Sequence, residues 1–466
     1  MTRESWTTRT GFILAAAGSA VGLGNVWRFP WMTAQNGGSA FLMLYLALVL
    51  IVGVPGLLAE FVIGRRARRN PVGALSSLSE SDRWGVVGLI PVVTTVFLLS
   101  FYSVVGGWIL RYLVGSATGA YFDAPGAYFD SIAFGPEAVA FQAVFLAATA
   151  AIVFGGVRRG IEAATKVMMP AIVVLLVGLA AWGTTLSGAG DGLSFFLSFD
   201  AAYLRENFFD VLGAATGQAL FTLSVGAGTM ITYASYLGED RSLAADGATI
   251  AVFNTLIGVV AGLVVFPLLF AQDLPVGESG PGALFVSLAG AFSTLPAGRL
   301  VGVVFFGVMT LAALSSSISM LELPVAFLVD EYDVERRRAT AGLAGLFLVF
   351  GAVNALRPAV FDFVASTLVD LLLSLGLLCF LLFTGWVLGT DATEEFRNGA
   401  GSLGRVLALP WLYVVGVVLP LGLTFTVTTG VLGVANVSLP SAAVAALSVT
   451  AAVAAFVGLR RSRSVL

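Results

Sequence analysis

The sequence predicts an all-α membrane protein. Of its 466 residues, 58% are hydrophobic and only 11% are charged, and the mean hydropathy is +0.96. Water-soluble domains typically contain about 25% charged residues and about 45–50% apolar ones. Since one bilayer-spanning helix needs about 20 mostly apolar residues, this hydrophobic content is enough for about a dozen spans joined by short loops.

Apolar runs separated by short polar breaks supply twelve candidate transmembrane helices. They lie at 11–34, 39–64, 88–115, 138–155, 161–185, 210–236, 245–271, 299–328, 339–356, 362–388, 409–430 and 440–459. The run at 275–298 is interrupted by proline and glycine, so we expect an extracellular loop there instead of a span.

Basic residues are unevenly distributed between the two sides of the predicted bundle. If the N-terminus is cytoplasmic, nearly all of the 24 basic residues fall on the cytoplasmic side; the exceptions are Arg28, Arg111, Arg205, Arg299 and Arg357. By the positive-inside rule, this asymmetry predicts a multi-pass protein of the cell membrane with both termini in the cytoplasm.

Several functional classes are disfavoured by composition. The chain has no histidine and a single cysteine, Cys379, so it lacks the Ser–His and Cys–His pairs of common hydrolases and the usual ligands of a transition-metal site. A formal net charge of −3 does not favour nucleic-acid binding. We therefore expect neither an enzyme nor a nucleic-acid-binding protein, and no sequence feature requires a protein partner.

Two predicted spans are interrupted at corresponding places. The first contains Val21-Gly22-Leu23-Gly24, and the sixth contains Val225-Gly226-Ala227-Gly228. Paired glycines weaken a helix, and backbone groups released inside the bilayer are tolerated only where they line a cavity or bind a ligand. The alternative is that these glycines only permit close helix packing. The matched pair favours an inverted five-helix repeat, with domains at 1–185, 186–388 and 389–466.

Neutral polar residues accompany these breaks. They are Asn25, Thr222, Ser224, Asn254 and the run Ser315-Ser316-Ser317. Neutral oxygens suit a hard monovalent cation, although each residue alone could equally serve as an interhelical hydrogen-bonding group. Arg28 and Asp362 are intramembrane charges of opposite sign, which are costly to bury unless paired or hydrated.

The motifs resemble those of one known family. The segment from Gly22 to Pro30, followed by Asn36-Gly37-Gly38, resembles the first span of the neurotransmitter:sodium symporters. Matching motifs follow at Gln218 to Ser224 with Tyr233-Ala234-Ser235-Tyr236, and at Gly160-Ile161-Glu162 with Met169-Pro170. The resemblance runs from about Arg3 to Asp362. It implies a prokaryotic amino-acid transporter with the LeuT fold, in which helices 1–5 and 6–10 form an inverted 5+5 repeat, helices 1 and 6 are broken, and helices 11 and 12 follow.

The same resemblance implies two sodium sites. One would use the Ala20 carbonyl, Asn25, Thr222, Asn254 and the carboxylate of the substrate. The other would use carbonyls of Gly18, Val21 and Ala312 with the hydroxyls of Ser315 and Ser316. Because the first sodium shares a ligand with the substrate, each would raise the affinity of the other by the same factor.

An amino-acid site would lie between the two breaks. The backbone near Ala20, Gly22 and Gly24, the Tyr102 hydroxyl and carbonyls near Phe221 and Thr222 would hold the charged groups of the substrate. The remaining pocket residues implied are Val21, Leu98, Ser224, Ala227, Ser316 and Met320. Monoamine transporters of the family place an aspartate where this chain has Gly22, so the resemblance implies a zwitterionic L-amino acid. Ala227 stands where larger residues are common, which favours a large apolar or aromatic substrate.

Gates are implied on both sides of this site. Arg28 with Asp362 would form the outer pair, Tyr102 and Phe221 an aromatic lid, and Arg3 with Asp330 the inner latch.

This chain departs from the family pattern at a few positions. Gly258 replaces the serine of chloride-dependent members and the acid of chloride-independent ones, while Tyr45, Gln218 and Thr222 remain as chloride ligands, so chloride binding stays open. Ser19 replaces an asparagine. Glu322 and Asp370 are intramembrane acids, for which proton antiport and structural burial both remain open. Glu60 matches a family acid that we expect to brace the broken sixth helix.

A sodium symporter explains these features better than a channel, which would need repeated polar rings along a pore. A sensor of the same fold, which binds an amino acid without transporting it, stays open.

Overall fold

The computed structural model describes residues 5–79, 81–238, 241–272, 282–435, 437, 443–444 and 446–451. All regular secondary structure in these ranges is helical, which confirms the predicted fold class. Nine continuous helical segments among these residues are long and apolar enough to cross a bilayer. Three of them directly follow the first span: Ser39–Ala67 (α3, Ser39–Leu48; η2, Val49–Gly53; α4, Val54–Ala67), Asp82–Thr118 (α6, Asp82–Val87; α7, Leu89–Thr118) and Pro136–Phe154 (α9).

The remaining six continuous spans follow in chain order. They are Val157–Gly183 (η3, Val157–Glu162; α10, Ala163–Gly183), Leu243–Phe270 (α15), Gly298–Tyr332 (α17), Arg336–Leu356 (α18), Pro358–Leu388 (α19, Pro358–Phe363; η4, Val364–Leu368; α20, Val369–Leu382; η5, Phe383–Leu388) and Gly404–Leu432, which lies within α22 (Ser402–Tyr413), η6 (Val414–Val418) and α23 (Leu419–Val434).

The two spans with paired glycines are broken, as predicted. The first consists of α1 (Arg9–Ala20), η1 (Gly24–Arg28) and α2 (Phe29–Gln35), and its two halves are bent by 47°. The sixth consists of α13 (Phe208–Thr222) and α14 (Thr229–Ala234), separated by residues 223–228. The predicted twelfth span, 440–459, falls largely outside the described residues.

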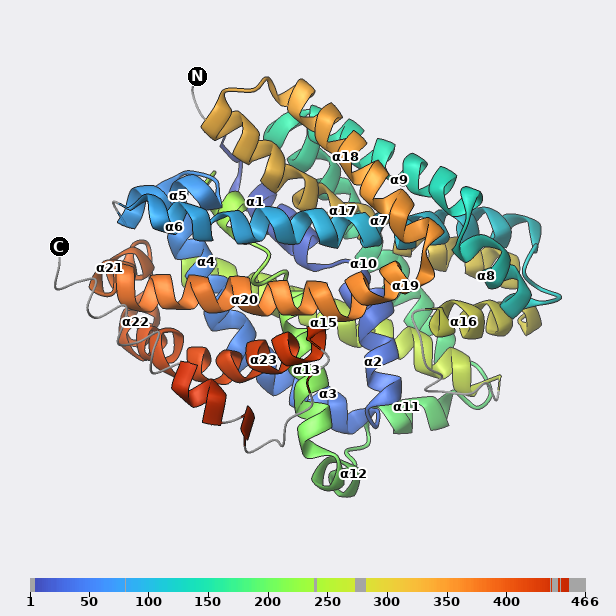
Figure 1. Cartoon of the computed structure of the whole chain (residues 1–466). Coiled ribbons are helices and arrows are strands. Elements are labelled where there is room, and N and C mark those ends of the chain that lie inside the picture. Colours follow the sequence, from blue (N-terminus) through green and yellow to red (C-terminus); the bar gives the residue numbers. More distant parts are fainter. Residues whose placement is uncertain are drawn as a thin grey trace.

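Short helices cover the two ends of the bundle. In Figure 1, α5 (Pro71–Ser79), α6 and α21 (Thr390–Arg397) lie toward the left end, while α8 (Pro125–Ala133) and α16 (Ala283–Thr294) lie toward the right end. Two further short helices, α11 (Ala189–Leu197) and α12 (Ala201–Glu206), lie near the bottom of this view. The segment 275–298, which we expected to be a loop, therefore contains a helix; its 12 residues are too few to span a bilayer.

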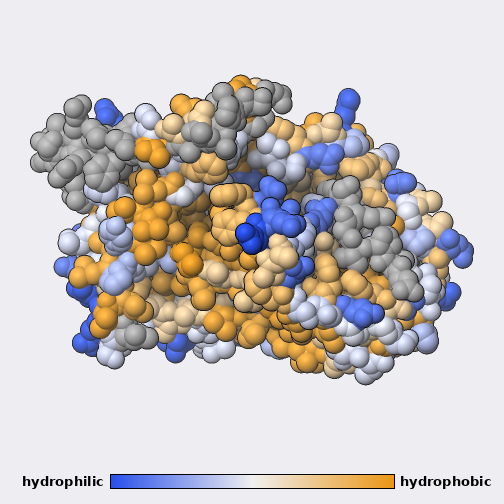
Figure 2. Space-filling view, turned by 90° about the horizontal axis from the view of Figure 1, so that it is seen from below, coloured by the Kyte–Doolittle hydropathy of each residue, from blue (hydrophilic) through white to orange (hydrophobic). Residues whose placement is uncertain are grey.

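The surface of the bundle is strongly apolar. Figure 2 shows broad hydrophobic areas between scattered polar groups. Exposed large apolar side chains include Val167 and Val174 on α10 and Val349 and Val353 on α18. Such continuous exposure is typical of a surface that contacts lipid, so the chain is a multi-pass membrane protein.

The sixth-span break contains three residues in the left-handed backbone region. Ser224 has φ 53°, Gly226 has φ 92° and Gly228 has φ 71°. A Cβ on Gly226 would overlap the Leu373 carbonyl of α20, so this glycine is needed for both its conformation and its packing. The Gly226 N–H donates to Glu60 Oε1 at 2.6 Å. Glu60 thus satisfies a backbone group that the break releases, as the sequence predicted.

Candidate functional site

Four oxygen atoms converge where the two breaks face α15. Asn254 Oδ1 lies 3.2 Å from the Ala20 carbonyl oxygen, 3.1 Å from the Thr222 carbonyl oxygen and 3.3 Å from Asn25 Oδ1. The side chains of Asn25, Thr222 and Asn254 are fully buried. Acceptors at these separations repel one another unless a cation lies between them, and oxygens that coordinate a hard cation octahedrally at about 2.4 Å are about 3.4 Å apart. In the alternative amide orientation, Asn254 Nδ2 donates to the Ala20 and Thr222 carbonyls and to Asn25 Oδ1, and these contacts are hydrogen bonds.

Side chains and carbonyls within the breaks hold this cluster in place. The Gly22 N–H donates to Asn25 Oδ1 at 3.2 Å, and Asn25 Nδ2 donates to the Asn254 carbonyl at 2.8 Å. On the opposite side, Gln218 Nε2 donates to the Gly24 carbonyl at 2.6 Å. The unwound first span is therefore fixed to α13 and α15 through its own released backbone groups.

A second oxygen cluster lies between α1 and α17. Ser315 Oγ donates to the carbonyls of Val21 and Ala312, both at 2.9 Å. Ser316 Oγ lies 3.4 Å from the Gly18 carbonyl and donates to the Ser19 carbonyl at 3.0 Å. The structure thus brings together all five residues that the family resemblance assigns to a second cation site. Hydroxyls and carbonyls can ligate an alkali cation without a carboxylate.

A cavity lies between these clusters. Its lining comes from both breaks and from α7, α17 and α20: Ser19, Ala20, Gly24, Leu98, Tyr102, Phe221, Ser224, Ala227, Ser316, Met320 and Leu373. Its free volume is about 10 Å³, which is about enough for one water molecule. The lining side chains must therefore separate to admit an amino acid.

Most of the expected pocket residues line this cavity, but three do not. Val21, Gly22 and Thr222 are not among its lining residues; the Val21 carbonyl accepts from Ser315, and Thr222 contacts Asn254. Ser19, whose replacement of a family asparagine was expected to affect substrate contacts, and Leu373, which was not predicted, also line it. Ser19 adjoins the first break, which could have identified it, whereas Leu373 is an ordinary apolar residue of a distant span.

Polar groups in the cavity point at backbone atoms of the first break. Tyr102 Oη accepts from the Leu23 N–H at 3.2 Å, and Ser224 Oγ donates to the Ser19 carbonyl at 2.9 Å. A Cβ on Gly22 would overlap Ser316 Oγ and approach Tyr102 Oη to 2.9 Å. This packing has no room for a side chain at Gly22, and no carboxylate group is among the lining residues.

The outer ion pair differs from the prediction. Arg28 Nη2 contacts Asp370 Oδ2 at 3.0 Å, and the guanidinium carbon lies 4.6 Å from the centre of the Phe221 ring. Asp362, the predicted partner, is exposed in the short helix α19. The pairing with Asp362 is therefore wrong. The π-helical turn η4 lies between the two aspartates and shifts the helical register, which the sequence did not reveal.

Asp370 also lines a second, larger cavity of about 230 Å³ between α13, α20 and α23. Leu373 lines both this cavity and the inner one, and the ring of Phe221 in the inner lining contacts the Arg28 guanidinium.

The opposite end of the site contains further charged contacts. Asp330 Oδ2 accepts from the backbone N–H of Asn70 at 3.2 Å, and Arg3, its predicted partner, lies outside the described residues. Glu322 is fully buried, contacts Arg336 at 2.6 Å and accepts from Tyr236 Oη at 2.9 Å. Both intramembrane acids that were open to a proton-transfer role, Glu322 and Asp370, thus have ion-pair partners.

Tyr45 and Gln218 are two of the chloride ligands that the family resemblance implies. Tyr45 Oη and Gln218 Oε1 are buried and have no hydrogen-bond partner in the part of the chain that the structure describes. A Cβ on Gly258 would approach Asn25 Nδ2 only to 3.6 Å, so the glycine leaves space beside the first oxygen cluster.

Comparison with known proteins gives a consistent result. Residues 3–123 and 133–399 match the sodium:neurotransmitter symporter family. The uncharacterized sodium-dependent transporter YhdH of Bacillus subtilis is 34% identical over 436 residues, which cover 90% of this chain and 95% of that protein. An uncharacterized sodium-dependent transporter of Methanocaldococcus jannaschii is 32% identical over 449 residues, covering 92% of this chain and 90% of the relative.

A solved structure shares the fold over nearly the whole chain. The crystal structure of MhsT in complex with L-phenylalanine superposes with a TM-score of 0.81 at 37% sequence identity, and covers 92% of this chain and 99% of MhsT. This agreement confirms the LeuT-type architecture expected from the broken spans. The chain therefore belongs to the sodium:neurotransmitter symporter family and is a sodium-dependent transporter, not an enzyme.

Proposed function

We propose that this protein imports zwitterionic L-amino acids with large apolar or aromatic side chains, driven by sodium and by alternating access to the two sides of the membrane. The observation that carries this proposal is the convergence of oxygens from Ala20, Asn25, Thr222 and Asn254 beside a cavity without a carboxylate. A cation there would meet the carboxylate of a bound amino acid, which supplies the missing negative charge.

Two sodium ions are proposed. The first is held by the oxygen cluster at Asn254 and by the substrate carboxylate; the second is held by Gly18, Val21, Ala312, Ser315 and Ser316. Both groups of sodium ligands include atoms from the C-terminal end of α1 and from the first break. Displacement of α1 would separate these atoms from α15 and α17. Sodium binding therefore favours the conformation in which the first span is packed against these two helices.

The proposed substrate follows from the shape and polarity of the cavity. Gly22 leaves no room for the aspartate that an amine without a carboxylate would require. Apolar atoms of Leu98, Phe221, Ala227 and Met320 face the remaining space. MhsT, whose complex contains L-phenylalanine, offers a precedent for an aromatic amino acid in the same fold.

The outer gate is proposed to consist of Arg28 with Asp370, and of Tyr102 with Phe221. The inner latch is proposed to include Arg3 and Asp330. The positive-inside rule places the Arg-rich loops, and with them both termini, in the cytoplasm of the cell. We also propose that residues 1–185 and 186–388 are the two inverted repeats, and that 389–466 contains helices 11 and 12 and a cytoplasmic tail.

Chloride is proposed as an additional bound ion. The Tyr45 hydroxyl is a buried donor without a partner among the described residues, and space remains at Gly258. An anion there, held by Tyr45, Gln218 and Thr222, would balance the charge of the nearby sodium. No carboxylate stands at Gly258 to take this role.

Reconstituted uptake tests the proposal. Proteoliposomes with an inward sodium gradient should accumulate labelled L-phenylalanine above equilibrium, and unlabelled tryptophan, tyrosine and leucine should compete better than glycine or alanine. Replacing chloride by gluconate should reduce uptake, and Tyr45→Phe should weaken this dependence. Passive equilibration would indicate a channel, and sodium-dependent binding without accumulation would indicate a sensor.

A further inference from the structure

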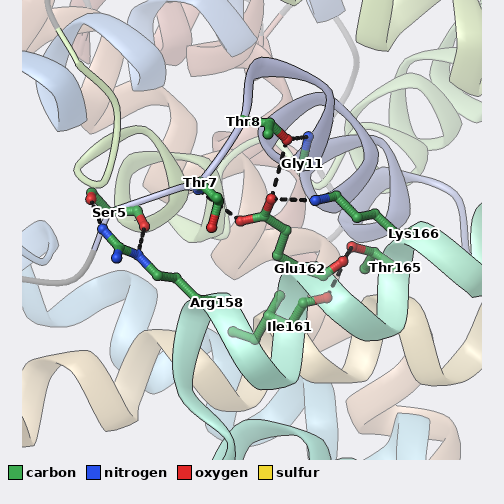
Figure 3. A network of polar contacts seen from close by, with 9 residues as sticks. All are labelled: Ser5, Thr7, Thr8, Gly11, Arg158, Ile161, Glu162, Thr165 and Lys166. Carbon is green, nitrogen blue, oxygen red and sulfur yellow. Dashed lines mark hydrogen bonds and ion pairs between the residues drawn. The ribbon is translucent and has the colours of Figure 1, made fainter.

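The segment before α1 is bound to the beginning of the fifth span by a polar network that the proposed substrate and sodium sites do not use (Figure 3). Arg158 donates from Nε to the Ser5 carbonyl at 2.8 Å and from Nη2 to Ser5 Oγ at 2.7 Å. Two residues further on, the Thr7 N–H donates to Glu162 Oε2 at 2.9 Å. Arg158 and Glu162 both belong to η3, so one helical turn holds both ends of this short segment.

Glu162 completes the N-terminal cap of α1 from a different helix. Thr8 is the N-cap residue, and its Oγ1 accepts from the Gly11 N–H at 2.9 Å while donating to Glu162 Oε1 at 3.2 Å. The first turn of α1 contains no acidic residue of its own. A carboxylate at a helix N-terminus interacts favourably with the helix dipole and with unpaired N–H groups. In Figure 3 the Glu162 side chain points into this first turn.

The fit of this carboxylate depends on glycine. A Cβ on Gly11 would overlap the carboxylate of Glu162, so the acid can lie against the backbone of α1 only because residue 11 has no side chain. The Glu162 side chain is 2% exposed, and Lys166, one turn later on α10, donates to Oε1 at 2.7 Å. The charge is therefore both buried and balanced, which makes the contact specific and not an incidental surface pair.

The position of α1 matters for both proposed sodium sites. Its last residues supply the Gly18 and Ala20 carbonyls, and the Val21 carbonyl follows directly. Under the proposed alternating access, these sites would open to the cytoplasm by movement of the N-terminal end of α1 away from the fifth span. That movement must break the bonds from Thr7 and Thr8 to Glu162.

We propose that Glu162 is a positioning residue of the inner gate: its carboxylate, seated at Gly11, holds the cytoplasmic end of α1 closed and releases it once in each transport cycle. This inference rests on the proposed function, because it concerns access to the same site. It adds to the latch proposed between Arg3 and Asp330, since it joins α1 to a different span.

Accessibility of single cysteines tests the latch without relying on transport. In a Cys379→Ala background, Ser235→Cys reports on the cytoplasmic side, because Ser235 is buried at the end of α14. Thr367→Cys reports on the outer side, because Thr367 lines the larger cavity. Each is labelled with a membrane-impermeant maleimide in membrane vesicles of known orientation, with and without sodium.

Two variants weaken the latch by independent means. Glu162→Gln keeps the shape of the side chain but removes its charge. Gly11→Ala keeps the charge but places a methyl group where the Glu162 carboxylate packs against α1. Each should accelerate labelling of Ser235→Cys about tenfold, as expected for loss of a charge-assisted hydrogen bond, and slow labelling of Thr367→Cys. Glu162→Asp, which keeps the charge, should give an intermediate rate. The matched control is Glu335→Gln, because Glu335 forms an exposed pair with Arg338 at 3.3 Å.

Three outcomes would overturn the proposal: unchanged labelling in both latch variants, faster labelling on both sides, which indicates general loosening, or an equal effect of the control. The external sodium concentration for half-maximal uptake should also rise in the latch variants, because fewer molecules face outward. If the unmodified protein fails to transport while the labelling pattern holds, the proposed function fails and the latch stands.

Discussion

Replacing Asn254 by alanine tests the first cation site most directly. The substitution removes one of four converging oxygens and leaves the Ala20 carbonyl, the Thr222 carbonyl and Asn25 Oδ1 in place. Loss of one buried polar partner costs about 1–3 kcal/mol, and every 1.4 kcal/mol is about a tenfold change in affinity. We therefore expect the sodium concentration for half-maximal binding to rise by about 5–150-fold.

The linkage between ion and substrate sharpens this prediction. Because the proposed sodium shares the carboxylate of the amino acid, a loss of sodium affinity must appear as weaker substrate binding at low sodium and must recover at saturating sodium. Equilibrium binding of labelled L-phenylalanine to purified protein, measured over a series of sodium concentrations, would show both effects.

Asn354→Ala provides the matched control. Asn354 is also a buried asparagine of a spanning helix, and its Nδ2 donates to Ser100 Oγ at 3.2 Å and to the Phe350 carbonyl at 2.9 Å, away from both breaks. It should lower the stability to a similar extent without changing the sodium dependence. If Asn254→Ala binds sodium within about twofold of the unmodified protein, or if both variants shift it equally, the assignment of the oxygen cluster is refuted.

Three further substitutions test the outer gate, the break in the sixth span and the substrate pocket. Asp370→Asn should reduce the rate of sodium-driven uptake severalfold with about 0–1 kcal/mol of lost stability, while Asp362→Asn should leave uptake unchanged; the reverse order would restore the pairing expected from the sequence. Gly226→Ala should lower the free energy of unfolding by about 1–3 kcal/mol or more in a thermal melt, because it combines strained backbone with steric overlap, and Gly213→Ala, with open space around its Cα, should not. Ala227→Leu should shift competition from aromatic toward small amino acids, and unchanged selectivity would exclude this position from the substrate pocket.

Local chemistry explains why so much of the fold was predictable. The length of each apolar run reflects the thickness of the bilayer, so span positions follow from the order of apolar runs and polar breaks. The two breaks could be found because the same Val-Gly-x-Gly pattern recurs at corresponding places in two apolar runs, and backbone groups released inside the bilayer need a partner. The role of Glu60 was expected from the family resemblance, and its contact with the Gly226 N–H agrees with the need of a released backbone group for a partner.

Pairing across long sequence separations was less predictable. Arg28 of the first span pairs with Asp370 and not with Asp362. The π-helical turn η4 lies between the two aspartates and shifts the helical register, and such a turn has no sequence signature. Leu373 enters the cavity because α20 packs against the sixth-span break, where Gly376 allows the Gly226 carbonyl to approach. The helix α16 within the predicted loop forms despite flanking turn residues, because its apolar side chains Phe285 and Phe292 are buried against the bundle.

The sequence by itself determined that this protein spans a membrane in helices, where two of those helices break, and which neutral oxygens accompany the breaks. These properties depend on hydrophobicity and on backbone preferences, which act within a few residues. Only the tertiary structure decided which aspartate meets Arg28 and which carboxylate caps α1. These contacts join residues more than 150 positions apart for Glu162 with Thr7 and more than 300 apart for Arg28 with Asp370, and packing of whole helices sets their geometry.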